Sequence, residues 1–324
     1  MDMRTVVTGG AGFIGSHLVD RLLEGGNEVL IVDDFSNGYE ENLPDPEPDS
    51  IRVVREDVSS KATLDVVRES RPELIYHLAC YPRSISFSDP EHCATVNLIS
   101  TYGLCEVARS MGSGIVFSSN SGLIGEPRYL PVDEEHPVHP TTPYDVHKLA
   151  SEHAIRIYSE SCGIGGVVLR FASVYGPRQR PNDRLGWRPI VPEWISRLSA
   201  GEPIVIESTG DQTRDFVYVD DVVDAVLRAG KKALEKRVFG GPYLIGTGIE
   251  TSINQLHEIL RSMIGGTSET KHAARKLGDI DRMAYSNKKA RSDLGWEPET
   301  RLQDGLKSTV EWWTTRLGRT VDRE

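Results

Sequence analysis

Short apolar runs alternate with amphipathic stretches through the first half of the chain. Runs of mostly apolar residues, typical of strands that are buried on both faces, occur at residues 3–8, 28–32, 51–55, 74–79, 115–118 and 166–171. Apolar residues at helical spacing occur between them, at residues 15–24, 63–70, 94–110 and 144–161. This alternation predicts an α/β fold with a Rossmann-type, doubly wound parallel sheet.

The alternation becomes irregular after residue 176. The later pattern consists of a helix at residues 192–200, a strand at 203–206, a helix at 221–228 and a strand at 242–245. We therefore expect a nucleotide-binding domain over residues 1–170 and a smaller α/β substrate domain over 171–324. The segments of about 215–245 are expected to return to the first sheet.

Composition and charge narrow the classes of partner. Apolar residues make up 38% and charged residues 26% of the chain, which is typical of a folded globular protein. The net charge of −11 favours neither nucleic acid nor an anionic membrane as a partner. We expect a cytoplasmic protein, because the first residues lack the basic and apolar regions of a signal peptide. The four cysteines have no C-x-x-C spacing, so we expect reduced thiols and no metal.

A glycine cluster separates the first predicted strand from the first predicted helix. Gly9, Gly12 and Gly15 have the spacing G-x-x-G-x-x-G. Glycines at these positions permit a tight turn and a close approach of the backbone to a ligand, and the N-terminus of a helix attracts a pyrophosphate. The cluster therefore predicts a dinucleotide site at the start of the helix.

Acidic residues at the end of the second predicted strand indicate which dinucleotide binds. Asp33 lies where a carboxylate can accept hydrogen bonds from both ribose hydroxyls of NAD, and Asp34 adds negative charge. No Arg or Lys occurs between residues 29 and 49, so a 2′-phosphate would be repelled and NAD is favoured over NADP. Asp57 and Val58, after the third strand, are candidates to flank the adenine, although Asp57 also fits a solvated loop.

Tyr144 and Lys148 are four residues apart in a predicted helix, so their side chains share one face. A lysine ammonium beside a phenol favours the phenolate, which makes Tyr144 a candidate base and Lys148 the group that tunes it. Without the upstream nucleotide motif, the same spacing would be read as ordinary surface residues. With that motif, it predicts a catalytic pair.

Seven ordered segments together resemble the extended short-chain dehydrogenase/reductase family, and within it the nucleotide-sugar epimerases of the UDP-glucose 4-epimerase type. The segments are residues 8–17, 32–38, 77–79, 143–148, 170–179, 214–222 and 294–298. The resemblance implies that NAD accepts a hydride from C4 of a UDP-sugar while Tyr144 takes the hydroxyl proton. The resulting 4-ketose would turn over and receive the hydride on its other face. It also implies cofactor contacts from Gly9, Gly12, Phe13, Ile14, Gly15, Asp33, Asp34, Asn37, Gly38, Asp57, Val58, Leu78, Ala79, Tyr144 and Lys148.

The chain departs from the family pattern at the third catalytic position. Asn120 stands where the family has a Ser or Thr hydroxyl, and an amide can donate a hydrogen bond but cannot relay a proton. Either Asn120 suffices, or Ser119 or Ser121 takes the role, or the activity is altered. Related dehydratases and decarboxylases have acidic residues where this chain has Ser121 and Gly122, so plain hydride return is favoured. An oxidoreductase, decarboxylase or dehydratase, or a non-catalytic NAD-binding relative, is the alternative.

The resemblance also implies the substrate contacts and the assembly. The implied contacts are Arg83, Ser84, Asn97, Ser173, Arg178, Arg214 and Arg275. Arg214 and Arg275 would hold the diphosphate, with Lys276 as the alternative to Arg275. Asn97 also fits a buried polar cap and Arg178 a solvated loop charge. Met283, near the sugar pocket, favours a roomy site, and the helices at residues 94–110 and 144–161 would form a homodimer interface.

Overall fold

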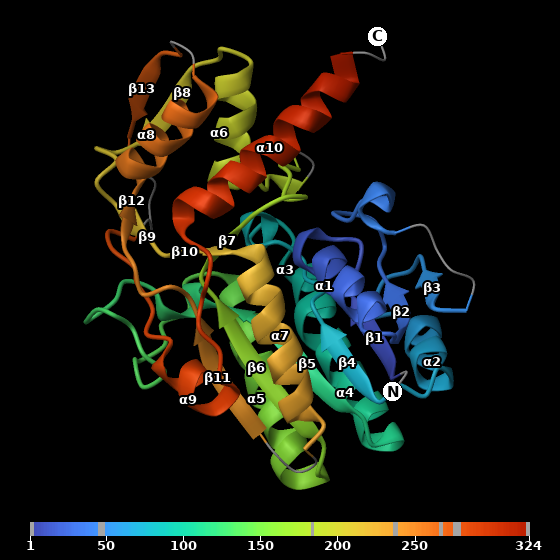
Figure 1. Ribbon diagram of the computed structural model, residues 1–324. Coiled ribbons are helices and arrows are strands. Elements are labelled where there is room, and N and C mark those ends of the chain that lie inside the picture. Colours follow the sequence, from blue (N-terminus) through green and yellow to red (C-terminus); the bar gives the residue numbers. More distant parts are fainter. Residues whose placement is uncertain are drawn as a thin grey trace.

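The computed structural model describes residues 3–44, 49–182, 185–235, 239–265, 268–274 and 280–321, with only the backbone of 317–321 (Figure 1). Seven parallel strands form one sheet in the order β11-β6-β5-β4-β1-β2-β3. Their bounds are β1 Arg4–Thr8, β2 Glu28–Val32, β3 Ile51–Val54, β4 Leu74–His77, β5 Gly114–Asn120, β6 Gly165–Phe171 and β11 Phe239–Ile245. The prediction of a doubly wound parallel sheet is confirmed.

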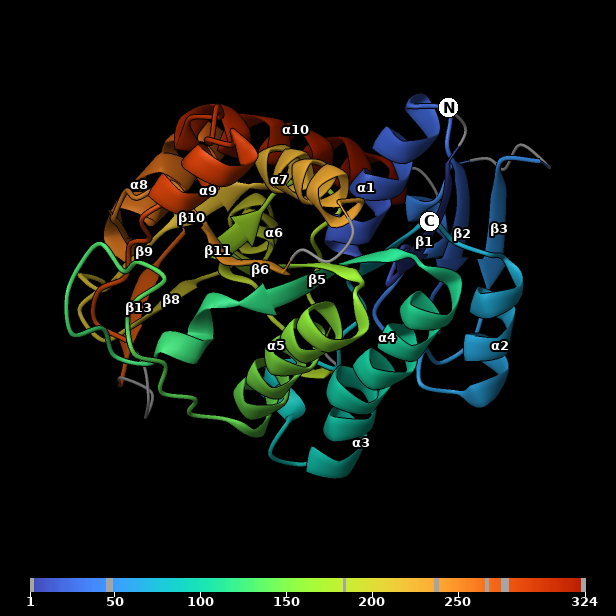
Figure 2. The same ribbon diagram turned by 90° about the horizontal axis from the view of Figure 1, so that it is seen from below.

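Helices cover both faces of this sheet because alternate strand residues point to opposite sides. Figure 2 shows α1 (Phe13–Glu24) and α7 (Val219–Ala233) on one face, and α4 (Ser100–Met111) and α5 (Pro143–Cys162) on the other. The helix α2 (Lys61–Glu69) packs beside α4. In β5, Val116 belongs to the first apolar core, whereas Ile115 and Phe117 belong to the second.

The C-terminal elements gather beyond one end of the sheet (Figure 1). They comprise α6 (Ile190–Ser199), α8 (Ile253–Ile264), α10 (Leu302–Val321) and the parallel pair β8 (Ile204–Glu207) and β13 (Thr270–Ala273). Two smaller pairs join β7 (Ser173–Tyr175) to β10 (Phe216–Tyr218) and β9 (Thr213–Arg214) to β12 (Thr251–Ser252). A further helix, α9 (Lys288–Leu294), packs near β11. One continuous apolar core reaches from Val7 in β1 to Trp194 in α6 and Leu256 in α8.

Two segments refine the sequence-based expectations. The strand that was expected to return to the first sheet does so as β11, which pairs with β6. The helix expected over residues 94–110 is instead divided into α3 (Pro90–Ala94), a wider π turn at Thr95–Ile99, and α4. Among the described residues, no helix has both the length and the apolar character that crossing a membrane requires.

Candidate active site

The glycine turn between β1 and α1 has no room for side chains. Gly9 has a φ of +72°, and a Cβ there would lie 2.8 Å from the backbone nitrogen of Ala79. A Cβ on Gly15 would lie 2.0 Å from the carbonyl oxygen of Gly9. The N-cap residue of α1 is Gly12, so the helix has no side-chain cap, and its first turn contains no acidic residue. Its N-terminal amides therefore suit an anionic ligand.

Asp33 stands beside this turn at the end of β2. Its Oδ2 accepts a hydrogen bond from the Ala11 amide and its Oδ1 one from the Phe35 amide, each at 2.9 Å. Burial raises the pKa of Asp33, while these backbone hydrogen bonds oppose the rise. A Cβ on Gly38 would lie 2.7 Å from Asp33 Oδ1, so a glycine is needed there. Two neighbouring loops thus hold the carboxylate in place at the predicted cofactor site.

The other residues predicted to contact the cofactor lie in the segments that follow the carboxyl ends of the strands. Asp34 is exposed and accepts hydrogen bonds from Ser36, whereas Asn37 Oδ1 accepts one from Asn182. Asp57 Oδ1 accepts a hydrogen bond from the Ser59 amide at 2.7 Å, which closes a turn before α2.

Three further residues were predicted to contact the cofactor, and they follow β3 and β4. Val58 is 4% exposed and packs in the second apolar core. Leu78 and Ala79 come directly after β4, and the Ala79 amide donates to Thr8 Oγ1 at 3.2 Å.

Tyr144 and Lys148 lie in the first two turns of α5. Lys148 is 1% exposed, and its Nζ donates to the carbonyl oxygen of Ser118 in β5 at 2.9 Å. The same Nζ lies 5.7 Å from the centre of the Tyr144 ring. The helix spacing therefore brings both groups to one place, and the hydrogen bond ties α5 to β5.

The pKa values of the pair are set mainly by burial. Burial raises the pKa of Tyr144 well above its usual value of 10, and Cys80 and Asp145 add to the rise. Burial also lowers the pKa of Lys148, against the opposing effects of Cys80, Cys93 and Glu152. A neighbouring lysine ammonium alone would lower the pKa of Tyr144, so the shift in this structure has the opposite direction. Burial thus opposes the shift that Lys148 was predicted to give, and the tuning of Tyr144 by Lys148 stays a prediction.

The three candidates for the third catalytic position differ in their hydrogen-bond partners. Ser119 is buried and donates to Glu152 Oε1 at 2.5 Å, and Glu152 in turn accepts two hydrogen bonds from Arg170. That hydroxyl serves a structural network. Ser121 forms a side-chain hydrogen bond with Tyr285. Asn120 is different, because its buried Nδ2 has no partner among the described residues.

Asp145, which follows Tyr144, is fully buried at the start of α5. Its Oδ2 accepts a hydrogen bond from the Thr142 amide and faces Arg83 at 3.4 Å. Arg83 was predicted as a substrate contact, but its guanidinium is directed at this carboxylate and at Thr141 Oγ1. The sequence analysis did not single out this buried carboxylate beside Tyr144.

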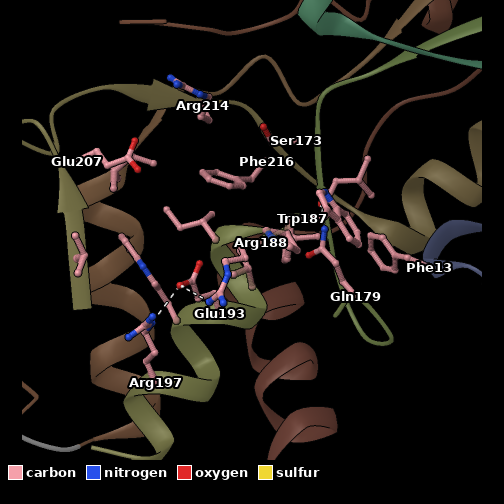
Figure 3. Close-up of a pocket in the computed structure, with 18 of the residues that line it drawn as sticks. Phe13, Ser173, Gln179, Trp187, Arg188, Glu193, Arg197, Glu207, Arg214 and Phe216 are labelled. Atoms are coloured by element: carbon pink, nitrogen blue, oxygen red, sulfur yellow. Dashed lines mark hydrogen bonds and ion pairs between the residues drawn. The ribbon is translucent and has the colours of Figure 1, made fainter. Parts of the chain in front are cut away.

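A pocket of about 760 Å³ lies between α1 and the C-terminal elements (Figure 3). Phe13 and Ile14 of α1, Ser173 of β7 and Arg214 of β9 are lining residues that the sequence predicted. Figure 3 shows Arg214 and Glu207 on one side of the pocket and Phe13 on the other. The lining, as far as the structure describes it, does not include Tyr144 or Lys148.

The charged lining residues of this pocket are largely ones that the sequence analysis missed. They are Arg188, Glu193, Arg197, Glu207 and the predicted Arg214, so cations are in the majority. Glu193 accepts a hydrogen bond from Arg197 at 3.1 Å and lies 3.7 Å from Arg188. The aromatic and cationic pair Trp187–Arg188, directly before α6, was the available signal. A local excess of arginine suits a diphosphate ligand within an acidic protein.

Three residues predicted to contact the substrate have hydrogen-bond or ion-pair partners within the protein. The amide of Asn97 is buried and binds both the N–H and the carbonyl of Tyr81, so it is the buried polar cap. Arg178 pairs with Asp20 at 2.7 Å. Ser84 Oγ donates a hydrogen bond at 2.7 Å to the carbonyl oxygen of Leu185, the residue before the pocket-lining Gly186.

Met283, Arg275 and Lys276 complete the predicted set. Met283 is buried in a small apolar cluster with Ile124 and Tyr285. Arg275 and Lys276 lie outside the described residues. No group of three or more His, Cys, Asp or Glu side chains in the described parts of the chain is arranged to hold a metal ion. The four cysteines are free thiols.

Comparison with known proteins gives a consistent result. The sequence model of the NAD dependent epimerase/dehydratase family matches residues 5–246. A UDP-glucose 4-epimerase of Mycolicibacterium smegmatis is 39% identical over 320 residues, which cover 97% of this chain and 99% of that protein.

Two solved structures are similar over nearly the whole chain. The UDP-glucose 4-epimerase of Thermotoga maritima with UDP-glucose has a TM-score of 0.90 at 36% identity, over 97% of this chain and all of that chain. The UDP-glucose 4-epimerase of Thermus thermophilus in complex with NAD has a TM-score of 0.86 at 33% identity, over 96% and 99% of the two chains.

Proposed function

The chain belongs to the NAD-dependent epimerase/dehydratase family, and from this premise we propose that it is an NAD-dependent epimerase that inverts C4 of a UDP-sugar of the UDP-glucose/UDP-galactose type. The observation that carries the proposal is the placement of Tyr144 and Lys148 on one face of α5, tied to β5 near the glycine turn. The similarity to a UDP-glucose 4-epimerase over 97% of the chain supports the choice of substrate.

The glycine turn and the end of β2 are suited to NAD. Gly9 and Gly15 leave a cradle that a Cβ would fill, and the uncapped start of α1 faces the pyrophosphate. The carboxylate of Asp33, held by the Ala11 amide, would accept hydrogen bonds from the ribose hydroxyls, and the exposed Asp34 would disfavour a 2′-phosphate. When bound, NAD supplies an acceptor that takes the hydrogen of C4 and gives it back.

The side chains around Tyr144 handle the proton and the sugar oxygen. Tyr144 takes the proton of the 4-hydroxyl and later returns it to the opposite face of the sugar. Lys148, held by the Ser118 carbonyl, provides positive charge beside the phenol. The unpaired amide of Asn120 donates a hydrogen bond to the sugar oxygen. Ser121 and Gly122 offer no acid at the position used by dehydratases and decarboxylases, so these residues would favour isomerisation as the net reaction.

The nucleotide-sugar diphosphate would lie in the pocket between α1 and α6. Arg214 and Arg188 supply positive charge there, and Ser173 supplies a hydroxyl. We assign the binding of NAD mainly to residues 1–170 and the binding of the UDP-sugar mainly to residues 171–324. The predicted role of Arg275 stays a prediction.

We also propose that the protein forms a homodimer through α4 and α5. These helices pack side by side, and apolar side chains stand exposed on them and on the π turn before α4. They are Ile99, 55% exposed, Tyr102, 42%, Val146, 53%, and Ile157, 49%. Clustered exposed apolar residues of this size favour burial against a second copy.

The test is to incubate the purified protein with UDP-glucose and, separately, with UDP-galactose, and to separate the C4 epimers. We expect the same equilibrium mixture from either direction, without net reduction of NAD. Tyr144→Phe should lower turnover by about 100- to 10,000-fold, because the proton acceptor is lost. Tyr158→Phe is the matched control, since that phenol lies on the same helix and donates to Glu106. A 4-keto-6-deoxy sugar or carbon dioxide as the main product would contradict the proposal.

A further inference from the structure

An arginine from the C-terminal half of the chain holds the loop that follows β2. This loop, residues 34–42, ends in a short 3₁₀ turn at Glu40–Asn42. Arg180, in the segment after β7, is 7% exposed, and its guanidinium donates to Glu41 Oε1 at 2.5 Å and to Asn42 Oδ1 at 2.9 Å. The planar fork of one buried arginine therefore binds two consecutive side chains of the loop.

The same loop holds the glycine turn. Asn42 Nδ2 and the Tyr39 amide both donate to the carbonyl oxygen of Ala11, at 2.9 and 3.0 Å. The Ala11 amide in turn donates to Asp33, the residue expected to bind the ribose of NAD. Asn42 is 2% exposed, so its side chain is enclosed between Ala11 and Arg180. A continuous chain of hydrogen bonds thus runs from Arg180 through Asn42 to the turn that would receive the pyrophosphate.

The last helix of the chain also contacts this arginine. The guanidinium of Arg180 lies 4.2 Å from the centre of the Tyr39 ring and 5.3 Å from that of Trp312 in α10. Arg316, one turn further along α10, lies 5.5 Å from the centre of the Trp312 ring and also binds Glu41. We call these five side chains the arginine cluster. They join the loop to α10.

A second contact links the loop to the segment that carries Arg180. Asn182 Nδ2 donates to the Ser36 carbonyl oxygen at 3.1 Å and to Asn37 Oδ1 at 2.9 Å. The segment therefore holds the loop near its start as well as at its end. Arg180, Asn182 and α10 all lie outside residues 1–170, to which we assign the binding of NAD.

We propose that the arginine cluster retains NAD in the protein by fixing the loop 34–42 against the glycine turn. Arg180 is a positioning residue, which acts on the turn through Asn42. Retention suits the proposed reaction, because NAD takes a hydride and gives it back and so need not leave after a turnover. The inference rests on the proposed function, since that function places NAD at this turn.

The experiment measures how fast NAD leaves the loaded protein. Radiolabelled NAD is bound, an excess of unlabelled NAD is added, and the label that stays on the protein is followed over time. In Arg180→Met, release should be about 10- to 100-fold faster than in the parent, because the hydrogen bonds of a charged group to two loop side chains are lost. Arg180 is outside the described lining of the pocket, so the Kd for UDP in calorimetry should stay unchanged.

Two further variants test the loop and α10 without removing a buried side chain. Glu41→Gln removes the carboxylate that both arginines bind, and Glu41 is about half exposed, so the fold should tolerate the change. Release should be about fivefold faster. Arg316→Met should have a smaller effect. The double variant should release NAD no faster than Glu41→Gln alone, because both changes remove the same ion pair.

Arg228→Met is the matched control. Arg228 also joins two segments, since it pairs with Asp224 in α7 and donates to the Gly295 carbonyl oxygen, and neither partner belongs to the loop 34–42. This variant should release NAD at the parent rate.

Three results would overturn a claim made here. If Arg180→Met and Glu41→Gln release NAD as slowly as the parent, or if Arg228→Met speeds release equally, the arginine cluster does not retain NAD and the epimerase proposal stands. If the parent protein binds no NAD, the proposed function itself is wrong.

Discussion

The imidazole of His77, at the end of β4, has no contact with solvent. Its Nδ1 lies 2.8 Å from Thr8 Oγ1 and its Nε2 lies 3.1 Å from Thr101 Oγ1. Burial, with a smaller contribution from Lys148, lowers the pKa of His77 to about 3. The folded protein therefore holds this ring neutral, as a bridge between two strands and a helix.

His77 predicts a loss of stability in acid. The unfolded chain gains a proton on this ring below a pH of about 6.5, whereas the folded state resists it down to about 3, so the free energy of unfolding falls between these values. In His77→Asn, the decrease from pH 7.5 to 5.5 should be smaller by about 1.4 kcal/mol. Urea titrations at both pH values measure it. Equal decreases in the two proteins would refute it, since the other histidines are common to both.

At the residue scale, the sequence predicted those residues whose positions depend on their near neighbours along the chain. The glycine turn, Asp33 and the Tyr144–Lys148 pair were predictable because their positions depend on one strand, one turn or one helix face. Asp145 was not, because its partner Arg83 lies 62 residues away along the chain. Asn97 was predicted as a substrate contact from the family resemblance, and the sequence did not show that its amide forms hydrogen bonds with the backbone of Tyr81.

At the scale of elements, a buried ion pair joins α5 to β6, next to the edge strand of the large sheet. Arg170 of β6 donates to both carboxylate oxygens of Glu152 in α5, at 2.9 and 2.7 Å, and Ser119 of β5 donates to the same group. Both charged side chains are 5% exposed. Because Glu152 is one turn after Lys148, the pair also fixes the part of α5 that carries the proposed catalytic residues.

Removing one partner of this ion pair should lower the stability of the folded protein. Arg170→Met leaves Glu152 buried without a countercharge, so the free energy of unfolding should fall by about 3–5 kcal/mol. The matched control is Arg156→Met on the same helix, which breaks the exposed Arg156–Glu160 pair and should cost less than about 1 kcal/mol. Urea unfolding compares the two. If both variants unfold at the same urea concentration as the parent, the pair does not support α5.

Strands were easier to predict than the interrupted helix. Every predicted strand of the large sheet overlaps the observed one, because continuous apolar runs define strands that are buried on both faces. The π turn at Thr95–Ile99 has no glycine or proline to announce it. The hydroxyls of Thr95, Ser100 and Thr101 donate hydrogen bonds to backbone carbonyls one turn earlier. These side chains compete with the backbone N–H groups for the same carbonyls, and the pattern of apolar and polar residues does not reveal this competition.

At the scale of the molecule, the proposed dimer predicts a mass of twice the 35.9 kDa chain. Ile157→Glu places a charge on the exposed apolar face of α5 and should give the single-chain mass in light scattering. Ile249→Glu is the control, because Ile249 is 66% exposed outside these helices. A parent protein that sediments as a single chain at every concentration would contradict the proposal.

The large sheet also has a consequence for biosynthesis. Its edge strand β11 comes from residues 239–245, long after the other six strands have left the ribosome. Until then β6, every residue of which is buried in the finished protein, has one unpaired edge. A bare edge of this kind readily pairs with other chains. A nascent or truncated chain that ends before β11 therefore exposes the unpaired edge of β6. Synthesis of the last quarter of the chain covers this edge and so protects the protein from aggregation.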